Sequence, residues 1–301
     1  MSDPGPPVLW TWRLIRLRIR RVARFALASF ILWLVWTLAV LALRNREDGS
    51  FIALLLLGLC IMLGAALTGL AWFMVTRRLR ERDAADLAQL VWLNQAMQPM
   101  RPLPPLGTWA ASPDLLVGLW RNIREERPLR VLETGSGLST LVMARALEQN
   151  QDGGELISLE DQTHFANKTR RELAGHGLES HARVLDAPLQ KQHVAGRQGL
   201  WYTLSSLEGL SDVELLFVDG PGNRERVMAL FLLHGLLAAT ADIVVDDIDR
   251  PETRHMLDLW LDAYPGQLSQ TGEGGRKWTL LRWQRSAEQG ARRPDAEQSG
   301  N

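Results

Sequence analysis

Residues 130–146 read R-V-L-E-T-G-S-G-L-S-T-L-V-M-A-R-A, and this stretch decides the fold. The apolar pair Val131-Leu132 and Glu133 are followed by Gly135-Ser136-Gly137, and a helical pattern begins at about Ser139. The pattern predicts a strand, a glycine turn and the N-terminus of a helix. Glycine lets the backbone approach a ligand closely, and the unpaired N–H groups of the helix point at the same place. In open α/β sheets such a crevice binds nucleotide-like ligands.

Short apolar strands alternate with helices on both sides of this stretch. After residues 131–133, the predicted strands are 155–159, 182–185, 213–218 and 242–245. The predicted helices are 139–148, 163–175, 224–239 and 252–263, and an earlier helix begins at Ser112-Pro113. This alternation is typical of a parallel sheet that helices cover on both faces.

The last two predicted strands, 267–271 and 276–283, are joined by Gly272-Glu273-Gly274-Gly275, which is a hairpin signal. We therefore predict an α/β fold: a Rossmann-like, mostly parallel seven-stranded sheet with a terminal antiparallel hairpin, preceded by two transmembrane helices. The globular domain is predicted over 108–285, and the charged segment 286–301 is predicted to be a disordered tail.

The part of the chain before the globular domain is basic and apolar. Residues 1–80 hold 11 Lys and Arg against 3 Asp and Glu, whereas the remainder holds 23 against 31. Residues 1–24 are predicted to be a basic cytoplasmic segment, and 25–75 a transmembrane hairpin whose uncharged runs are long enough to cross a bilayer. A cleaved signal peptide is the alternative for the first run, but that run is too long and a second follows at once.

The positive flanks of this hairpin predict where the protein lies. By the positive-inside rule, both termini and the catalytic domain face the cytoplasm at the cell (inner) membrane, with a multi-pass topology. Residues 76–107 are predicted to be a helical and Pro-rich linker. The apolar stripe of 76–97 either packs on the globular domain or pairs with a second copy of the chain in a homodimer. Because the globular part lacks a basic surplus, we expect no nucleic-acid partner.

Acidic residues follow every predicted parallel strand. They are Glu133, Glu160 with Asp161, Asp186, Asp219, and Asp246 with Asp247. The carboxyl ends of parallel strands meet at one edge of the sheet, so we expect these acids to gather there. The alternative is that several of them cap the helices that follow.

Five segments together resemble the class I S-adenosylmethionine-dependent methyltransferases, and most closely a small-molecule, O-methyltransferase-like subgroup. They are V-L-E-T-G-S-G-L-S-T at 131–140, L-I-S-L-E-D at 156–161, L-D-A at 185–187, L-L-F-V-D-G-P-G at 215–222 and D-I-V-V-D-D-I-D-R at 242–250. The resemblance covers roughly 108–285 and implies S-adenosylmethionine as the cofactor.

The resemblance also implies roles for single residues. Glu133 and the turn Gly135-Ser136-Gly137 would line the methionine end of the cofactor. Glu160, which lies 23 residues after Gly137, would accept hydrogen bonds from the ribose hydroxyls. Asp186 would meet the adenine amine, and Asp219 would lie near the sulfonium and the methyl acceptor.

An acceptor hydroxyl or amine must lose a proton, so a base beside it helps. Asp219 or Asp247 is predicted to serve, with His164, His193 and His255 as alternatives that we expect to be surface residues. In metal-assisted O-methyltransferases of this fold, acids after the fourth and fifth strands hold a divalent cation. Asp219, Asp246 and Asp247 could imitate that set, but the usual Asp-Asn pair is Asp-Asp here, and we predict no metal.

Two further features have alternative interpretations. Trp201-Tyr202 either flanks the acceptor or packs in the core. Arg250 either binds an acidic substrate or pairs with Asp247.

The sequence therefore predicts a membrane-anchored, S-adenosylmethionine-dependent methyltransferase that acts on a small-molecule or lipid-linked acceptor. One alternative is a non-catalytic membrane scaffold with a cofactor-binding domain. The other is an NAD-type oxidoreductase, which is disfavoured because Thr140 stands where a third glycine is expected.

Overall fold

The computed structural model describes residues 35–38, 50–105, 111–222, 225–275 and 277–285. The chain divides into two compact units, Met1–Asp83 and Ala84–Asn301, and each is described by itself. The predicted basic segment 1–24 and the predicted tail 286–301 lie outside the described residues, as does most of the first predicted membrane span.

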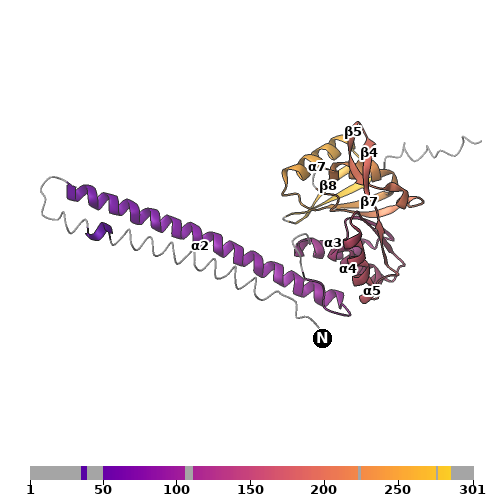
Figure 1. The fold of residues 1–301 in the computed structure, drawn as a ribbon, viewed down its shortest axis with the longest axis horizontal. Helices are drawn as coiled ribbons and strands as arrows, with labels where there is room; N and C mark the ends of the chain where they lie inside the picture. The colour runs from indigo at the N-terminus through magenta and orange to yellow at the C-terminus, as the bar shows by residue number, and fades with distance from the viewer. Residues whose placement is uncertain (1–34, 39–49, 106–110, 223–224, 276, 286–301) are drawn as a thin grey trace, which may run out of the picture. The chain divides into compact units, whose positions relative to one another are not determined.

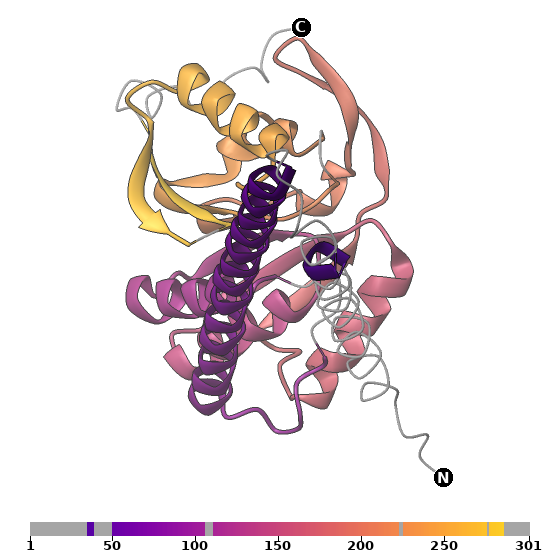
Figure 2. The same cartoon turned by 90° about the vertical axis from the view of Figure 1, so that its left-hand side faces the viewer.

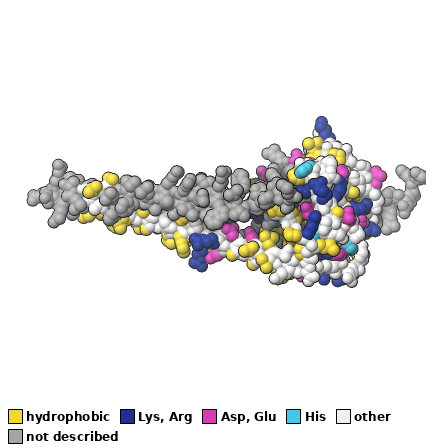
Figure 3. All heavy atoms as spheres, turned by 60° about the horizontal axis from the view of Figure 1, so that its bottom comes forward, with side chains coloured by type: hydrophobic (Ala, Val, Ile, Leu, Met, Phe, Trp, Pro, Cys, Tyr) yellow, Lys and Arg dark blue, Asp and Glu magenta, His cyan; other side chains and the backbone are white. Residues whose placement is uncertain are grey.

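The first unit holds a four-residue helical segment at 35–38 and most of α2, which runs as one helix over Ser50–Met97. Figure 3 shows exposed hydrophobic side chains along this helix, followed by a cluster of Lys and Arg. The stretch Leu54–Met97 is apolar and long enough to cross a membrane, a criterion that core helices and signal sequences also meet. The second predicted span is therefore a candidate transmembrane helix. Most of the first predicted span lies outside the described residues, so the structure does not test it.

The second unit is built on a seven-stranded sheet in the order β3-β2-β1-β6-β7-β9-β8. The strands are β1 (Arg130–Thr134), β2 (Glu155–Glu160), β3 (Ala182–Asp186), β6 (Val213–Val218), β7 (Leu237–Val245), β8 (Leu268–Gly274) and β9 (Thr279–Gln284). The first five strands in this order pair in parallel, whereas β9 is antiparallel to both β7 and β8. This confirms the predicted mostly parallel sheet with an antiparallel end.

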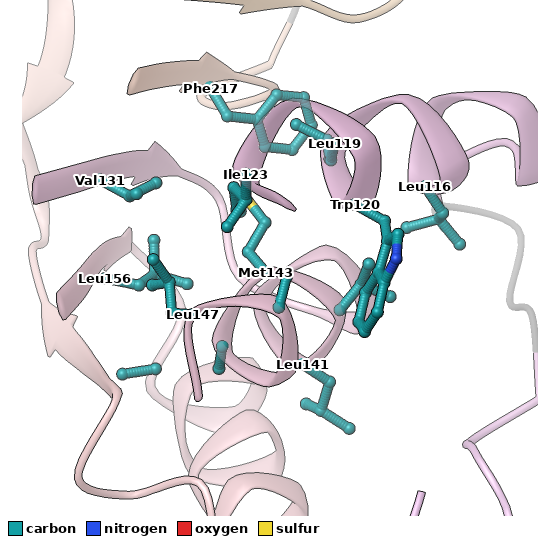
Figure 4. Close-up of a cluster of buried hydrophobic side chains, with 14 of the residues drawn as sticks. Leu116, Leu119, Trp120, Ile123, Val131, Leu141, Met143, Leu147, Leu156 and Phe217 are labelled. Carbon is teal, nitrogen blue, oxygen red and sulfur yellow. The ribbon is translucent and has the colours of Figure 1, made fainter. Parts of the chain in front are cut away.

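Helices cover both faces of the sheet (Figures 1 and 2). One face carries α3 (Pro113–Glu126), α4 (Leu138–Asn150) and α5 (Thr163–Gly175), and α7 (Pro251–Ala263) lies on the other. Figure 4 shows how Leu119 and Ile123 of α3 meet Met143 of α4, Val131 of β1 and Phe217 of β6. Strands buried on both faces need continuous apolar runs, which explains why sequences such as L-L-F-V form the central strands.

The end of α2 packs against this core. Leu93 and Met97 are each 1% exposed and belong to the cluster that α3 and α4 form. The side chain of Gln149 on α4 donates a hydrogen bond to the carbonyl of Ala96 at 3.1 Å. The end of the linker helix therefore packs on the globular domain, whereas Leu79, Leu87 and Val91 of its apolar stripe are exposed, and pairing with a second copy stays a prediction.

The structure corrects the helix predicted over 224–239. In its place are the 3-10 turn η2 (Glu225–Val227), the short helix α6 (Met228–Leu233) and the 3-10 turn η3 (His234–Leu236). Strand β7 already begins at Leu237, which is paired with Val213 of β6. The run L-L-A-A is apolar enough for a helix or a strand, and pairing with the neighbouring strand decided between them.

A two-stranded ribbon between β3 and β6 was missed from the sequence. Strands β4 (Leu189–Val194) and β5 (Arg197–Tyr202) pair antiparallel around Ala195-Gly196. Both turn residues have positive φ, 49° and 71°, as hairpin turns of the primed types require. Only the end of the ribbon is apolar and buried, so its alternation gave a weak signal.

Candidate active site

The glycine turn joins the ends of three neighbouring strands. Gly135 has φ of 90°, a left-handed conformation that glycine adopts without strain, and its N–H donates to the carbonyl of Leu159 at 2.8 Å. A Cβ on Gly135 would lie only 3.4 Å from the backbone nitrogen of Gly220. Gly220 in turn donates its N–H to the carbonyl of Thr134 at 2.7 Å and accepts the Thr134 hydroxyl at 2.8 Å. The turns after β1 and β6 are therefore locked together.

Glu133 lies beneath the turn and does not line the cavity described below. Its side chain is fully buried, and it accepts the hydroxyls of Ser139 at 2.5 Å and Thr140 at 2.7 Å. Thr140 also accepts the N–H of Gly137 at 2.9 Å. Glu133 thus binds the start of α4, and its predicted role at the methionine end of the cofactor stays a prediction. Gly137 likewise does not line the cavity, whereas Gly135 and Ser136 do.

Burial raises the pKa of Glu133 to about 7, against the lowering effect of the hydrogen bonds from Ser139 and Thr140. Removing a carboxylate from water disfavours its charged form, and no basic side chain compensates it here.

Glu160 reaches the turn from the end of β2. One of its carboxylate oxygens accepts both the N–H of Ser136 at 3.0 Å and the hydroxyl of Ser136 at 2.8 Å. The other oxygen accepts the N–H of Gln162 at 3.1 Å. Glu160 lines the cavity, beside Gly135 and Ser136. The structure therefore brings Glu160 to the glycine turn, as the sequence predicted.

Asp186 is not brought into the cavity. Its carboxylate pairs with the guanidinium of Arg170 on α5 at 2.7 Å, and its side chain is 49% exposed. The Cα atoms of Asp186 and Glu160 are register partners in the sheet, so topology did bring the two positions together. The Asp186 side chain pairs with Arg170 and does not line the cavity. Nothing in the sequence indicates this pairing.

Three acids gather at the ends of β6 and β7 around one buried arginine. One carboxylate oxygen from each of Asp219, Asp246 and Asp247 lies within 4.8 Å of the others. Arg226, whose side chain is 6% exposed, bonds Asp247 at 3.0 Å and Asp219 at 3.1 Å. Sequence analysis missed Arg226 because it fell inside the predicted helix 224–239.

These surroundings set the ionisation of the acids. Burial, and then the charge of Asp219, raise the pKa of Asp246 to about 7. Burial also raises the pKa of Asp219, although the charge of Arg226 opposes this shift. Asp246 accepts the N–H of Asp247 at 2.7 Å, whereas Asp219 and Asp247 are the two acids whose carboxylates bind Arg226.

Glu160, the three acids after β6 and β7, and Arg226 line one cavity of about 480 Å³, a size that suits a small molecule. Its charged lining side chains are the acids Glu160, Asp161, Asp219, Asp246 and Asp247 and the bases Arg226, Arg250 and Lys277. Five carboxylates against three basic groups favour a ligand that carries positive charge.

Tyr202 closes part of the cavity wall. It is 1% exposed, and a Cβ on Gly220 would lie 2.1 Å from its hydroxyl, so only glycine fits there. Trp201 beside it is fully buried in the core and does not line the cavity. Both residues thus pack in the core, while a place for Tyr202 beside the acceptor stays a prediction.

The remaining candidates lie as the sequence predicted. His164, His193 and His255 are all exposed and none of them lines the cavity. Arg250 pairs with Asp247 at 3.1 Å, which confirms the ion pair.

Residues 132–248 match the model of a family described as a methyltransferase domain. Most of the residues that line the cavity lie within this match, and Ser112, Arg250 and Lys277 lie outside it. Among curated proteins, no sequence matches the chain significantly.

Solved structures with a similar fold include three methyltransferases. One is an O-methyltransferase from Bacillus cereus in complex with S-adenosylhomocysteine, with 19% identity, 66% of this chain and 89% of that chain covered, and a TM-score of 0.44. Another is the O-methyltransferase TomG from Streptomyces achromogenes, with 20% identity, 65% and 87% covered, and a TM-score of 0.43. The third is a methyltransferase from Geobacter sulfurreducens, with 17% identity, 68% and 96% covered, and a TM-score of 0.46. At these values we transfer no residue role from them.

The raised pKa of Glu133 predicts a pH dependence of stability. Between pH 4.5 and about 7 the folded chain keeps a proton on Glu133 that the unfolded chain has released. The corresponding stability is fully present below pH 4.5 and is lost as pH rises through about 7. Glu133→Gln cannot ionise, so its free energy of unfolding relative to the wild type should rise by on the order of 3 kcal/mol from low to neutral pH.

Denaturant unfolding of the full chain at a series of pH values measures this difference. Glu179→Gln, at an exposed position, is the matched control and should follow the wild type at every pH. Parallel curves for wild type and Glu133→Gln would show that Glu133 is not buried as described.

Proposed function

We propose that the protein is an S-adenosylmethionine-dependent methyltransferase whose acceptor is a small molecule or a lipid-linked compound. The observation that carries the proposal is the pairing of Glu160 with Ser136 of the glycine turn, beside the acids at the ends of β6 and β7, around a single cavity. The match to a methyltransferase domain over 132–248 supports it independently.

The lining of the cavity suits this cofactor in its charge and in its hydrogen-bonding groups. S-adenosylmethionine supplies, when bound, a methyl group on a positively charged sulfur. The excess of carboxylates around the cavity favours that charge. One carboxylate oxygen of Glu160 accepts both hydrogen bonds from Ser136. The other oxygen accepts the N–H of Gln162 and has a second lone pair, which can accept a hydrogen bond from a ribose hydroxyl. The turn at Gly135 allows close backbone approach.

Methyl transfer asks the protein chiefly to align donor and acceptor for an in-line displacement. An acceptor oxygen forms the new bond to the methyl carbon while the carbon–sulfur bond breaks, and the acceptor proton must leave. We assign the role of base to Asp246, because it lines the cavity and has a pKa near 7, where a base works best at neutral pH. Asp219 and Asp247, the bases predicted from sequence, are bound to Arg226 and serve to position groups around Asp246.

An NAD-type oxidoreductase is less well supported. Its cofactor carries an anionic pyrophosphate, which the carboxylate-rich lining would repel. Thr140, which stands where a third glycine is expected, uses its hydroxyl to bind Glu133. A non-catalytic scaffold would differ from our proposal because it would bind no acceptor and transfer no methyl group.

We further propose that α2 attaches the enzyme to the cytoplasmic side of a membrane and that a lipid-linked acceptor reaches the site there. The exposed apolar side chains of α2, and the exposed arginines that follow them at 77, 78, 80 and 82, support this step. Pairing of two copies through the exposed Leu87 and Val91 is compatible with it. Release of the full chain from membranes by alkaline washing would contradict the attachment.

Isothermal calorimetry of the purified full chain tests the cofactor. S-adenosylhomocysteine should bind and NAD should not. Glu160→Gln should weaken S-adenosylhomocysteine binding roughly ten- to hundredfold, because buried hydrogen bonds lose their partner. Asp186→Asn is the matched control: it removes a strand-end carboxylate that lies outside the cavity and should leave the affinity unchanged. NAD binding, or a larger loss in Asp186→Asn than in Glu160→Gln, would contradict the assignment.

The pH dependence of methyl transfer tests the base. The rate should rise with pH through about 7, because only the ionised Asp246 accepts a proton. Asp246→Asn should slow transfer by about two to four orders of magnitude and abolish this rise. Asp258→Asn, an exposed change on α7, should leave the profile intact. A wild-type profile in Asp246→Asn would exclude Asp246 as the base.

A further inference from the structure

The carboxylates of Asp219, Asp246 and Asp247 lie close enough together that a positive charge among them would stabilise their ionised forms. One oxygen from each lies within 4.8 Å of the others, and at such distances like charges repel unless a cation compensates them or one acid keeps its proton. Oxygen ligands of this kind are those that Mg²⁺, Mn²⁺ and Ca²⁺ prefer. The charge can therefore come from a divalent ion or from the chain itself.

The chain supplies it. We infer that the guanidinium of Arg226 takes the place of a divalent cation among these acids, so that the site binds no metal and needs none. Arg226 bonds Asp219 at 3.1 Å and Asp247 at 3.0 Å, and only 6% of its side chain is exposed. A guanidinium stays charged at every accessible pH and bonds carboxylates through two directed N–H groups.

The same contacts leave little room for an ion. A metal would have to approach carboxylate oxygens to roughly 2.0–2.6 Å, and one oxygen of Asp219 and one of Asp247 already accept N–H groups of Arg226. The carboxylate oxygen of Asp247 that bonds Arg226 also bonds Arg250 at 3.1 Å, so both of its lone pairs are engaged. One oxygen of Asp246 accepts the N–H of Asp247 at 2.7 Å.

Arg226 is held in this position by the core and is not a mobile surface side chain. It belongs to η2, and the carbonyl of the next residue, Val227, accepts the indole N–H of Trp260 at 2.8 Å. Trp260 lies on α7 and is fully buried. The turn that carries Arg226 is thus anchored to the helix that follows Asp246 and Asp247.

This assignment narrows the class of acceptor, and that consequence rests on the proposed function. An enzyme that orients its acceptor through a metal uses oxygen atoms of the acceptor as ligands of that metal. With Arg226 in that place, an acceptor with a single hydroxyl or amine beside Asp246 meets the requirements of the site. Hydrogen bonds and charge, and no coordination bonds, orient such an acceptor.

Titration of the full chain with Mn²⁺, followed by electron paramagnetic resonance, tests the inference without any activity assay. Wild-type protein should bind no Mn²⁺ at this site at up to about 1 mM, a range that covers weak protein sites. Arg226→Met removes the charge and should create a site that binds one Mn²⁺ at least tenfold more tightly than wild type. Arg170→Met, which removes an arginine paired with Asp186 elsewhere, is the control and should behave as wild type.

Two outcomes would overturn the inference. The first is that wild-type protein binds one Mn²⁺ and that Asp247→Asn no longer binds it. This result would be decisive even if Arg226→Met fails to fold. The second is a folded Arg226→Met that gains no affinity. Should methyl transfer itself not be found, the titration still decides the role of Arg226. If transfer is found, it should persist in EDTA.

Discussion

The hydrogen bonds from the N–H and hydroxyl of Ser136 to Glu160 are the constraint on which the site depends. Glu160 ends β2 and Ser136 follows β1, so this contact ties the ends of two neighbouring strands. Because the turn is only a few residues long, the contact also fixes the direction in which α4 begins. The cavity lies beside this contact, and Gly135 and Gly220, whose backbones approach each other closely, are among its lining residues.

The second requirement of the site is electrostatic. A parallel sheet brings the carboxyl ends of its strands to one edge, and in this chain that edge is rich in acids. Burial raises the pKa values of Glu133 and Asp246, while Arg226 supplies charge to Asp219 and Asp247. The acids therefore differ in their interactions. Glu133 binds the start of α4, and Asp219 and Asp247 pair with Arg226, whereas Asp246 has a pKa of about 7 and lines the cavity. Acids at equivalent strand ends therefore have different partners and different pKa values.

The fold could be predicted from the sequence because hydrophobic periodicity is a local property, and because strands that alternate with helices form a parallel sheet. Strand-end acids such as Glu160 and Asp219 were found for the same reason, since only their place along a strand had to be known. The directions of side chains could not be found in this way. Asp186 turns to Arg170 and Glu133 turns to Ser139 and Thr140, and these partners are set by packing between helices and strands. Arg226 was not identified from the sequence because the apolar residues 227–233 that follow it suggest one continuous helix.

The central claim is that Glu160 and the acids after β6 and β7 surround one site for an adenosyl group. The most direct test is a structure of the full chain with S-adenosylhomocysteine. The account predicts ribose hydroxyls within hydrogen-bonding distance of Glu160 and the sulfur facing Asp219 and Asp246. A nucleoside bound away from Glu160, or adenine and ribose placed on the side of Asp186 and Arg170, would contradict it.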